Sequence, residues 1–215
     1  MYPINVDLRS RPCLVIGGGT VAERKIAGLL DEGAAVTVIA PTATETIKNR
    51  AAAGRLIWKA KKYERGDEKP FFLIICATDD EAVSLMASQA AEEAGKLINV
   101  CDVPHLCNFT VPAVVRQGDL QLAISTNGKG PAFSRWLRQR LEKCFDERYG
   151  RWLDEVARIR SAARSALSSP RDRHDFWRDA LTDDIMALVE QNDIDEASRR
   201  LARRLSEFER RRHET

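Results

Sequence analysis

The sequence predicts an α/β fold in which a parallel sheet wound by helices is followed by a hairpin, a helix and a helical domain. Through about residue 112, apolar runs of strand length alternate with amphipathic helical stretches, which is typical of parallel strands joined by helical crossovers. Beyond that point the apolar runs give way to one hairpin and then to charged helices. We therefore expect three parts: residues 1–112, 113–145 and 146–215.

The first part is expected to contain five strands and three helices, which the periodicity of the apolar residues places along the chain. The strands are expected at Cys13–Ile16, Val36–Ile39, Leu56–Lys59, Phe71–Cys76 and Leu97–Cys101. The helices are expected at Val21–Leu30, Thr44–Ala53 and Glu81–Ala94. Parallel strands with right-handed crossovers bring their carboxyl ends to one edge of the sheet.

The second and third parts change character. A Gln-Gly-Asp turn joins the apolar runs Ala113–Arg116 and Leu120–Ser125, which predicts an antiparallel hairpin. Pro131 stands where a first helical residue would start a helix over Ala132–Phe145. Further helices are expected at Arg148–Leu167, Arg171–Leu181, Asp183–Glu190 and Ile194–Arg212.

Composition excludes several classes of protein. With 215 residues, 44% of them hydrophobic, the chain can bury a sizeable core. The net charge of +2 lacks the concentrated basic excess of a nucleic-acid-binding domain. The apolar runs are shorter than the roughly 18 residues that span a bilayer, and no signal-peptide pattern opens the chain. The five cysteines lack paired spacing, which indicates reduced thiols in a cytoplasmic protein. We expect no nucleic-acid partner and no membrane.

A glycine turn follows the first expected strand and opens the first expected helix. Gly17-Gly18-Gly19-Thr20-Val21-Ala22 matches the dinucleotide fingerprint G-x-G-x-x-A in its strand–turn–helix setting. Gly17 permits the tight turn, and Gly19 lets the backbone approach a pyrophosphate at the helix N-terminus. The alternative is a tight turn that binds nothing. The sequence therefore predicts a Rossmann-type nucleotide site.

The acidic residue that usually ends the second strand and holds the ribose is missing. The strand Val36–Ile39 runs into Ala40-Pro41-Thr42, so backbone around Pro41 and the Thr42 hydroxyl would recognise the ribose. No arginine follows to bind a 2′-phosphate, which favours NAD over NADP. Thr78 and Asp79 end the fourth strand in chain order, where they either line the cofactor crevice or cap the next helix.

Asp102 is the candidate general base. It follows the fifth expected strand, at the same sheet edge as the glycine turn, where a partly shielded carboxylate could take a proton. The alternative is a turn aspartate bonded to its own backbone. His105 is a second candidate proton carrier. Cys101, His105 and Cys107 match no closed zinc pattern, so no metal site is expected.

Four motifs together resemble the sirohaem synthase family, specifically its precorrin-2 dehydrogenase/sirohydrochlorin ferrochelatase module. They stand in family order and cover the chain to about residue 145. They are Leu14–Lys25, Cys76–Asp80, Asn99–Asp102 and Ala123–Pro131.

The resemblance implies NAD-dependent oxidation of precorrin-2 to sirohydrochlorin in sirohaem (porphyrin) biosynthesis, and in some members Fe²⁺ insertion, a lyase activity. It places the catalytic aspartate on Asp102 and cofactor contacts on Thr20, Val21, Pro41 and Thr42. A serine that is phosphorylated in some relatives falls on Thr126. The chain would be a stand-alone module without the methyltransferase domain of fused members, and a separate enzyme would supply precorrin-2.

The resemblance also implies an intertwined homodimer in which residues 113–145 form the dimerisation element. An apolar stripe on the expected helix suits either this interface or a core: Phe133, Trp136, Leu137, Leu141 and Phe145. The tetrapyrrole substrate carries eight carboxylates, which cations would bind. The candidates are Arg116, Lys129, Arg135 and Arg138.

Two other functions would also use the glycine turn. A non-catalytic module that senses NAD or NADH needs neither Asp102 nor the substrate cations. Another NAD-dependent dehydrogenase with a helical substrate domain would need a base but a different set of cations.

Overall fold

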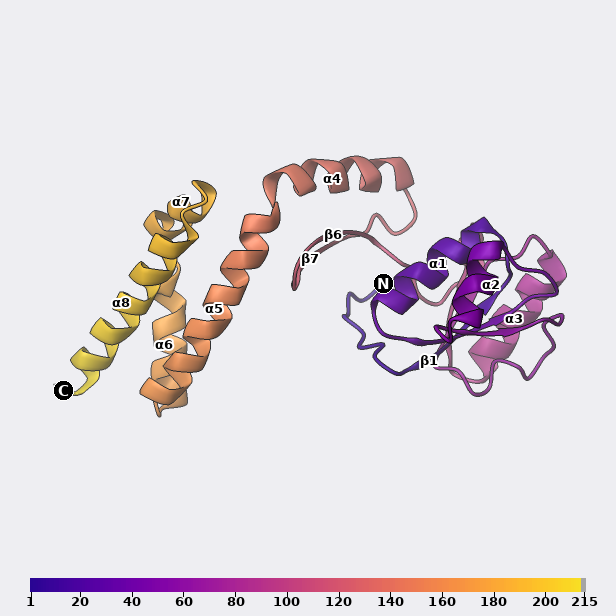
Figure 1. Cartoon of the computed structure of the whole chain (residues 1–215), viewed down its shortest axis with the longest axis horizontal. Helices are drawn as coiled ribbons and strands as arrows, with labels where there is room; N and C mark the ends of the chain where they lie inside the picture. The colour runs from indigo at the N-terminus through magenta and orange to yellow at the C-terminus, as the bar shows by residue number, and fades with distance from the viewer. Residues whose placement is uncertain (214–215) are drawn as a thin grey trace. The chain divides into compact units, whose positions relative to one another are not determined.

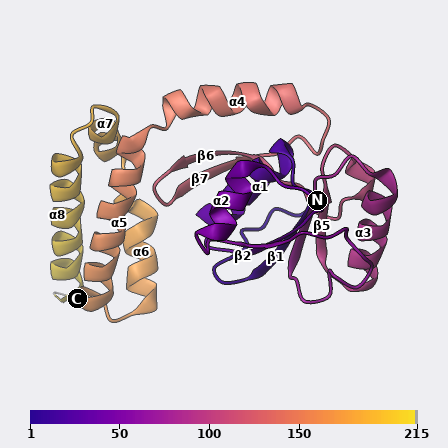
Figure 2. The ribbon, with the colours of Figure 1, turned by 45° about the vertical axis from the view of Figure 1, so that its right-hand side comes forward.

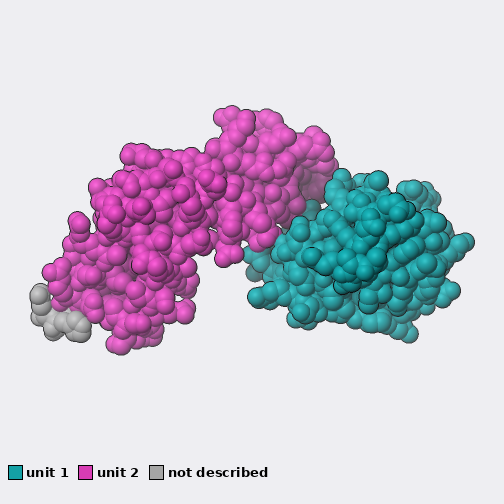
Figure 3. All heavy atoms as spheres, in the orientation of Figure 1, with its two compact units in different colours: residues 1–111 teal, residues 112–215 magenta. Residues whose placement is uncertain are grey.

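The computed structural model describes residues 1–213, and the chain divides into two compact units, Met1–Val111 and Pro112 onward (Figures 1 and 3). Each unit has a hydrophobic core of its own. We therefore describe each unit by itself.

The first unit is a parallel five-stranded sheet with the strand order β3-β2-β1-β4-β5. The chain leaves β1 in one direction to build β2 and β3, then returns to the other side of β1 for β4 and β5. The strands are β1 (Pro12–Ile16), β2 (Ala35–Ile39), β3 (Ile57–Lys59), β4 (Leu73–Cys76) and β5 (Leu97–Val100). The helices are α1 (Thr20–Asp31), α2 (Glu45–Ala52) and α3 (Glu81–Glu93), and a short 3₁₀ helix, η1, covers Pro104–Leu106.

Helices cover both faces of this sheet (Figure 2). On one face, Ile26 of α1 and Ile47 of α2 pack against Val15 and Val38. On the other, α3 and Tyr63 pack against the alternate residues of the same strands. Burial on both faces explains why β1, β2 and β4 are continuous apolar runs rather than alternating ones.

The second unit begins with the antiparallel hairpin of β6 (Ala113–Gln117) and β7 (Leu120–Ile124). Helix α4 (Pro131–Cys144) follows, and it buries none of its residues fully. The remaining helices share one core that includes Trp152, Phe176 and Leu201. They are α5 (Glu147–Ala166), α6 (Pro170–Ala180), α7 (Asp183–Glu190) and α8 (Ile194–His213).

These elements confirm the predicted fold class, and every expected strand and helix is present with its ends shifted by at most two residues. The largest shift is in β4, which begins at Leu73 instead of Phe71. Phe71 donates its N–H to Glu68 in a turn and so cannot join the ladder. The separation of residues 113–145 from the helical domain stays a prediction. Among residues 1–213, no helix is long and apolar enough to cross a membrane.

Candidate active site

The carboxyl ends of β1 and β4 mark where the strand order reverses, because the two strands are neighbours while the chain winds away from β1 on both sides. In doubly wound sheets, ligands bind outside the carboxyl ends of the strands at such a switch point. The predicted residues after β1, β2, β4 and β5 therefore lie along one edge of this sheet.

Two of the three glycines after β1 are required by close packing. Gly17 has φ +118°, and a Cβ built on it would lie 2.1 Å from the Ala77 carbonyl oxygen. A Cβ on Gly18 would lie 2.0 Å from the Thr42 carbonyl oxygen, and the Gly18 oxygen accepts the Thr44 N–H at 2.9 Å. The turn is thereby fixed against the loops that follow β4 and β2. The role of Gly18 depends on a segment distant in sequence, which explains why the motif alone did not show it.

Gly19 differs from both, because a Cβ built on it would meet no atom within 4 Å. It is the N-cap of α1, and no side chain caps that helix. The first N–H groups of a helix have no acceptor within the helix and favour a negative charge. Thr20 beside it is exposed and Val21 is half-buried. The uncrowded backbone at Gly19 and the uncapped start of α1 fit a pyrophosphate, so the residues present suit a dinucleotide.

The loop after β2 presents Pro41 and Thr42, both exposed. Thr44 accepts the Ile47 N–H at 3.3 Å as the N-cap of α2 and donates its hydroxyl to Glu23 of α1 at 2.8 Å. This hydrogen bond joins the helix of the glycine turn to the ribose side of the site, a link that the sequence analysis missed.

The loop after β4 separates the roles of three consecutive polar residues. Asp80 caps α3 by accepting the Ala82 and Val83 N–H groups at 3.0 and 3.1 Å. Thr78 accepts the Asp80 N–H at 3.3 Å. Asp79 is exposed and has no hydrogen bond or ion pair with any described residue. Since Asp80 supplies the cap, Thr78 and Asp79 are left available at the sheet edge.

Asp102 follows β5 with φ +62°, a left-handed conformation that aspartate tolerates better than most residues. It is exposed, and its carboxylate makes no hydrogen bond or ion pair within the described chain. The alternative of a turn aspartate bonded to its own backbone therefore has no support in the geometry. The carboxylate is available to a substrate.

The Cys107 thiol holds the turn that carries Asp102. Its sulfur lies 3.2 Å from both the N–H and the carbonyl oxygen of Val100 and 3.4 Å from the Val103 oxygen. Ser88 of α3 donates to the Leu106 oxygen at 2.9 Å. His105 is exposed on η1 and makes no side-chain hydrogen bond within residues 1–213. Cys107 therefore has a structural role in this turn.

The other cysteines near the sheet are also structural. Burial raises the pKa of the Cys13 thiol to about 11 and shifts the pKa values of Cys76 and Cys101 upward. Such thiols stay protonated and unreactive at neutral pH. Within the described chain, no three His, Cys, Asp or Glu side chains are grouped as metal ligands.

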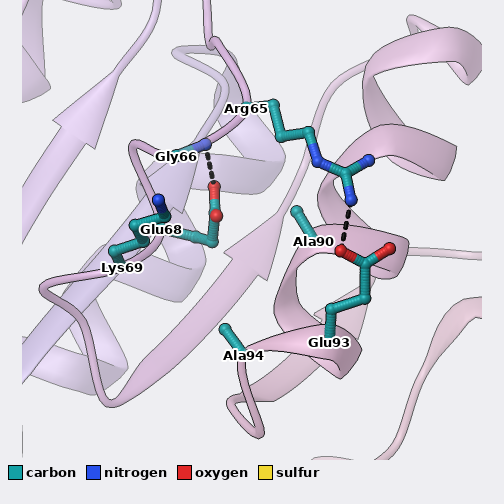
Figure 4. Close-up of a pocket in the computed structure, with 7 residues that line it drawn as sticks. All are labelled: Arg65, Gly66, Glu68, Lys69, Ala90, Glu93 and Ala94. Atoms are coloured by element: carbon teal, nitrogen blue, oxygen red, sulfur yellow. Dashed lines mark hydrogen bonds and ion pairs between the residues drawn. The ribbon is translucent and has the colours of Figure 1, made fainter.

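A hollow of the first unit, shown in Figure 4, lies near the amino end of β4, away from the edge that carries the predicted site residues. It measures about 430 Å³ and is lined by the loop before β4 and the last turns of α3. Arg65 and Glu93 form an ion pair across it, and Glu68 and Lys69 lie on its other side. The predicted site residues do not line this hollow.

The four candidate substrate cations all lie in the second unit. Arg116 is on β6 and has a partner, Lys129 is exposed in the loop before α4, and Arg135 is exposed on α4. Arg138 forms an ion pair with Glu142 one turn further along α4. Arg135 and Arg138 are three residues apart, which places them on one side of the helix.

Comparison with known proteins identifies the family. A family model described as putative NAD(P)-binding matches residues 4–113, and one described as the central part of a sirohaem biosynthesis protein matches residues 117–143. A third, the sirohaem synthase dimerisation region, matches residues 148–212. The chain belongs to the sirohaem synthase family. The family's dimerisation model thus covers the helical domain, whereas the resemblance implied that role for residues 113–145, where it stays a prediction.

Individual relatives agree with this assignment. The siroheme synthase of Methylococcus capsulatus is 41% identical over 197 residues, which are 92% of this chain and 42% of the relative. That of Neisseria meningitidis is 34% identical over 96% of this chain and 43% of the relative. The chain therefore spans about two-fifths of these relatives. The solved structure of SirC, precorrin-2 dehydrogenase, matches 93% of this chain and 99% of its own, with 32% identity and a TM-score of 0.75.

Proposed function

We propose that this chain oxidises precorrin-2 to sirohydrochlorin with NAD as the hydride acceptor, in sirohaem biosynthesis. The observation that carries the proposal is the free carboxylate of Asp102 at the same sheet edge as the open, uncapped turn at Gly19. The likeness to a precorrin-2 dehydrogenase along almost the whole chain supports this choice of reaction over another dehydrogenation.

The roles follow from the chemistry at this edge. Gly17, Gly19, Thr20 and Val21 would hold the pyrophosphate, and NAD when bound supplies the acceptor for a hydride. The second set of contacts comes from the loops after β2 and β4: Pro41, Thr42, Thr78 and Asp79.

Asp102 would accept the proton that leaves the macrocycle, so that one hydride and one proton account for each desaturation. Its exposed position lets a large substrate reach it without a buried channel. Cations of the second unit would bind the substrate's carboxylates, since paired guanidinium groups suit carboxylates well. These are Arg116, Lys129, Arg135 and Arg138.

We propose Fe²⁺ insertion into sirohydrochlorin as a second reaction of this chain, with the metal ion as a substrate. Metallation of sirohydrochlorin releases two pyrrole protons, and the carboxylate of Asp102 would accept them one at a time, releasing the first to solvent before it takes the second. We further propose a cytoplasmic homodimer as the working form, supported by the match to a dimerisation region.

The test is incubation of the chain with precorrin-2 and NAD, followed by the absorbance of the tetrapyrrole and of NADH. We expect the two signals to change together. NAD binding without turnover of precorrin-2 would refute the proposal and favour a NAD(H)-sensing module, and NAD-dependent oxidation of other compounds but not of precorrin-2 would favour a different dehydrogenase. A parallel incubation with sirohydrochlorin and Fe²⁺ tests the second reaction.

A further inference from the structure

A basic segment lies at the carboxyl end of β3, beside the proposed ribose contacts. Lys59 is the last residue of β3, and Lys61 and Lys62 follow it. β3 pairs in parallel with β2, and the register places Lys59 opposite Ile39, the last residue of β2. The Ala40 N–H also donates to the Lys59 carbonyl oxygen at 3.3 Å. The segment therefore begins one strand away from the loop that follows β2.

Two of these three lysines have uncompensated charge. Lys61 is paired with Asp67 at 2.9 Å and with Glu64 at 3.2 Å. Lys59 and Lys62 are exposed and make no side-chain hydrogen bond or ion pair with any residue from 1 to 213. Lys59 interacts electrostatically with Asp67 but makes no ion pair with it. The Asp67 carboxylate is already bonded to Lys61 and to the Glu64 N–H. Two cations are thus free to bind an anion.

No acidic group at the end of β2 opposes such an anion. An Asp or Glu at that place selects NAD, because it accepts the ribose hydroxyl and repels a 2′-phosphate. Here the segment 40–44 contains no acid. The nearby carboxylates are engaged, since Glu23 accepts the Thr44 hydroxyl at 2.8 Å and Glu45 is paired with Lys48 at 2.7 Å.

We propose that Lys59 and Lys62 bind the 2′-phosphate of NADP, so that this site accepts NADP as well as NAD. The proposal rests on the proposed function, because it concerns the same dinucleotide site. It extends the expectation from the sequence, which favoured NAD because no arginine follows β2. The cations come instead from the end of the neighbouring strand.

Calorimetric titration of the full chain with NAD and with NADP, at low ionic strength, tests the proposal. We expect the Kd for NADP to lie within about tenfold of that for NAD. Exposed ion pairs are individually weak, so Lys59→Ala with Lys62→Ala should weaken NADP binding by roughly tenfold and leave NAD binding unchanged. Added salt should weaken NADP binding to the wild type more than to this double variant.

The matched control is Lys69→Ala with Lys96→Ala, which removes the same charge at the amino ends of β4 and β5. It should leave both affinities unchanged. The proposal is overturned if NADP binds the wild type more than about tenfold more weakly than NAD, or if the Lys59/Lys62 variant loses both nucleotides equally or neither. Weak binding of NADP together with normal binding of NAD would leave the proposed function unaffected. A wild type that binds neither nucleotide would overturn both.

Discussion

Asp102 has a left-handed backbone and a carboxylate without a partner among the described residues. Replacement by alanine would add backbone strain, whereas asparagine tolerates this conformation. Asp102→Asn is therefore the cleaner variant. We expect it to keep NAD affinity and to lower kcat for precorrin-2 oxidation by roughly 10²–10⁴-fold, the usual contribution of one general base. Fe²⁺ insertion should fall with it.

His105→Ala is the control for that variant, because His105 is exposed three residues after Asp102. It should change either reaction much less. Wild-type turnover in Asp102→Asn together with loss in His105→Ala would show that the histidine carries the proton.

Gly19 tests the cofactor site separately from the chemistry. Because a Cβ at Gly19 meets no atom within 4 Å, Gly19→Asp should fold normally. Its carboxylate would lie where the pyrophosphate is expected, so NAD binding should be lost. Gly17→Ala should instead impair folding, since its Cβ would lie 2.1 Å from a backbone oxygen. Circular dichroism with an NAD titration distinguishes the two effects, and normal NAD affinity in folded Gly19→Asp would exclude the pyrophosphate role.

The roles of some individual residues could not be predicted from the sequence. Thr78, Asp79 and Asp80 are three adjacent polar residues before a helix. A shift of one residue in the start of the helix changes which of them is the N-cap. The structure assigns the cap to Asp80. Local patterns predicted the glycine turn and the place of Asp102 after a strand, but they left open whether its carboxylate is free or bonded to its own backbone. The constraint on Gly18 comes from a tertiary contact, which local patterns do not encode.

The loop between β3 and β4 is fixed by a buried hydrogen bond that no local pattern predicted. Tyr63 donates to Glu68 at 2.6 Å, and both side chains are buried. Burial alone would raise the pKa of Glu68, but hydrogen bonds from Tyr63 and the Gly66 N–H hold that pKa below its ordinary value. Burial and the same hydrogen bond raise the pKa of Tyr63 well above its usual range.

This loop should therefore make the stability of the first unit depend on pH. A carboxyl group with a lowered pKa stabilises the folded state above its unfolded pKa, about 4.3 for Glu, and this stability is lost as pH falls through the folded value. Tyr63→Phe should lower the free energy of unfolding at neutral pH by about 1–3 kcal/mol and reduce the further loss in acid. Tyr2→Phe, which removes an exposed hydroxyl, is the control. Equal acid sensitivity in Tyr63→Phe and the wild type, measured by urea unfolding, would contradict this account.

The contact between α5 and the β6–β7 hairpin depends on a glycine. A Cβ on Gly150 would lie 2.7 Å from the carbonyl oxygen of Gln117. Gly150→Ala should therefore move α5 away from the hairpin and lower the free energy of unfolding by about 1–3 kcal/mol. Gly28→Ala on α1 is the matched control, because its Cβ would meet nothing within 4 Å and alanine favours a helix. Greater stability of Gly150→Ala than of the wild type would show that the packing of α5 on the hairpin does not require a glycine at this position.

Most elements followed from local rules, because strands buried on both faces are continuous apolar runs and helices carry an apolar stripe. The observed ends of an element differ from the predicted ones where a turn takes up a backbone N–H. An example is Phe71, whose N–H donates to Glu68 instead of joining β4. The expected stripe on α4 is only partly buried. Leu137, Leu141 and Phe145 are half-buried, while Phe133 and Trp136 remain exposed. Periodicity alone cannot distinguish a core from an interface.

At the scale of the whole molecule, the net charge of +2 conceals local differences that matter for function. The lysines at and just beyond the end of β3 and the arginines of α4 are cationic groups in a nearly neutral chain. Local cations can bind anionic ligands without the long-range field that attracts nucleic acids. This distribution agrees with a protein that handles a dinucleotide and a polycarboxylate.

Assembly gives the last prediction. Phe133 and Trp136 are stacked with ring centroids 6.0 Å apart, and they are 56% and 55% exposed on α4. Two large aromatic side chains side by side on a surface favour burial against another protein, and a two-fold dimer uses the same surface on both copies. We expect a homodimer at micromolar concentration in sedimentation, and Phe133→Glu with Trp136→Glu should shift it to monomers with little change in circular dichroism. Leu85→Glu, at a 47% exposed apolar residue of α3, should remain dimeric. A double variant that sediments as the wild type does would place the interface on other elements, with the helices of residues 148–212 as the next surface to test.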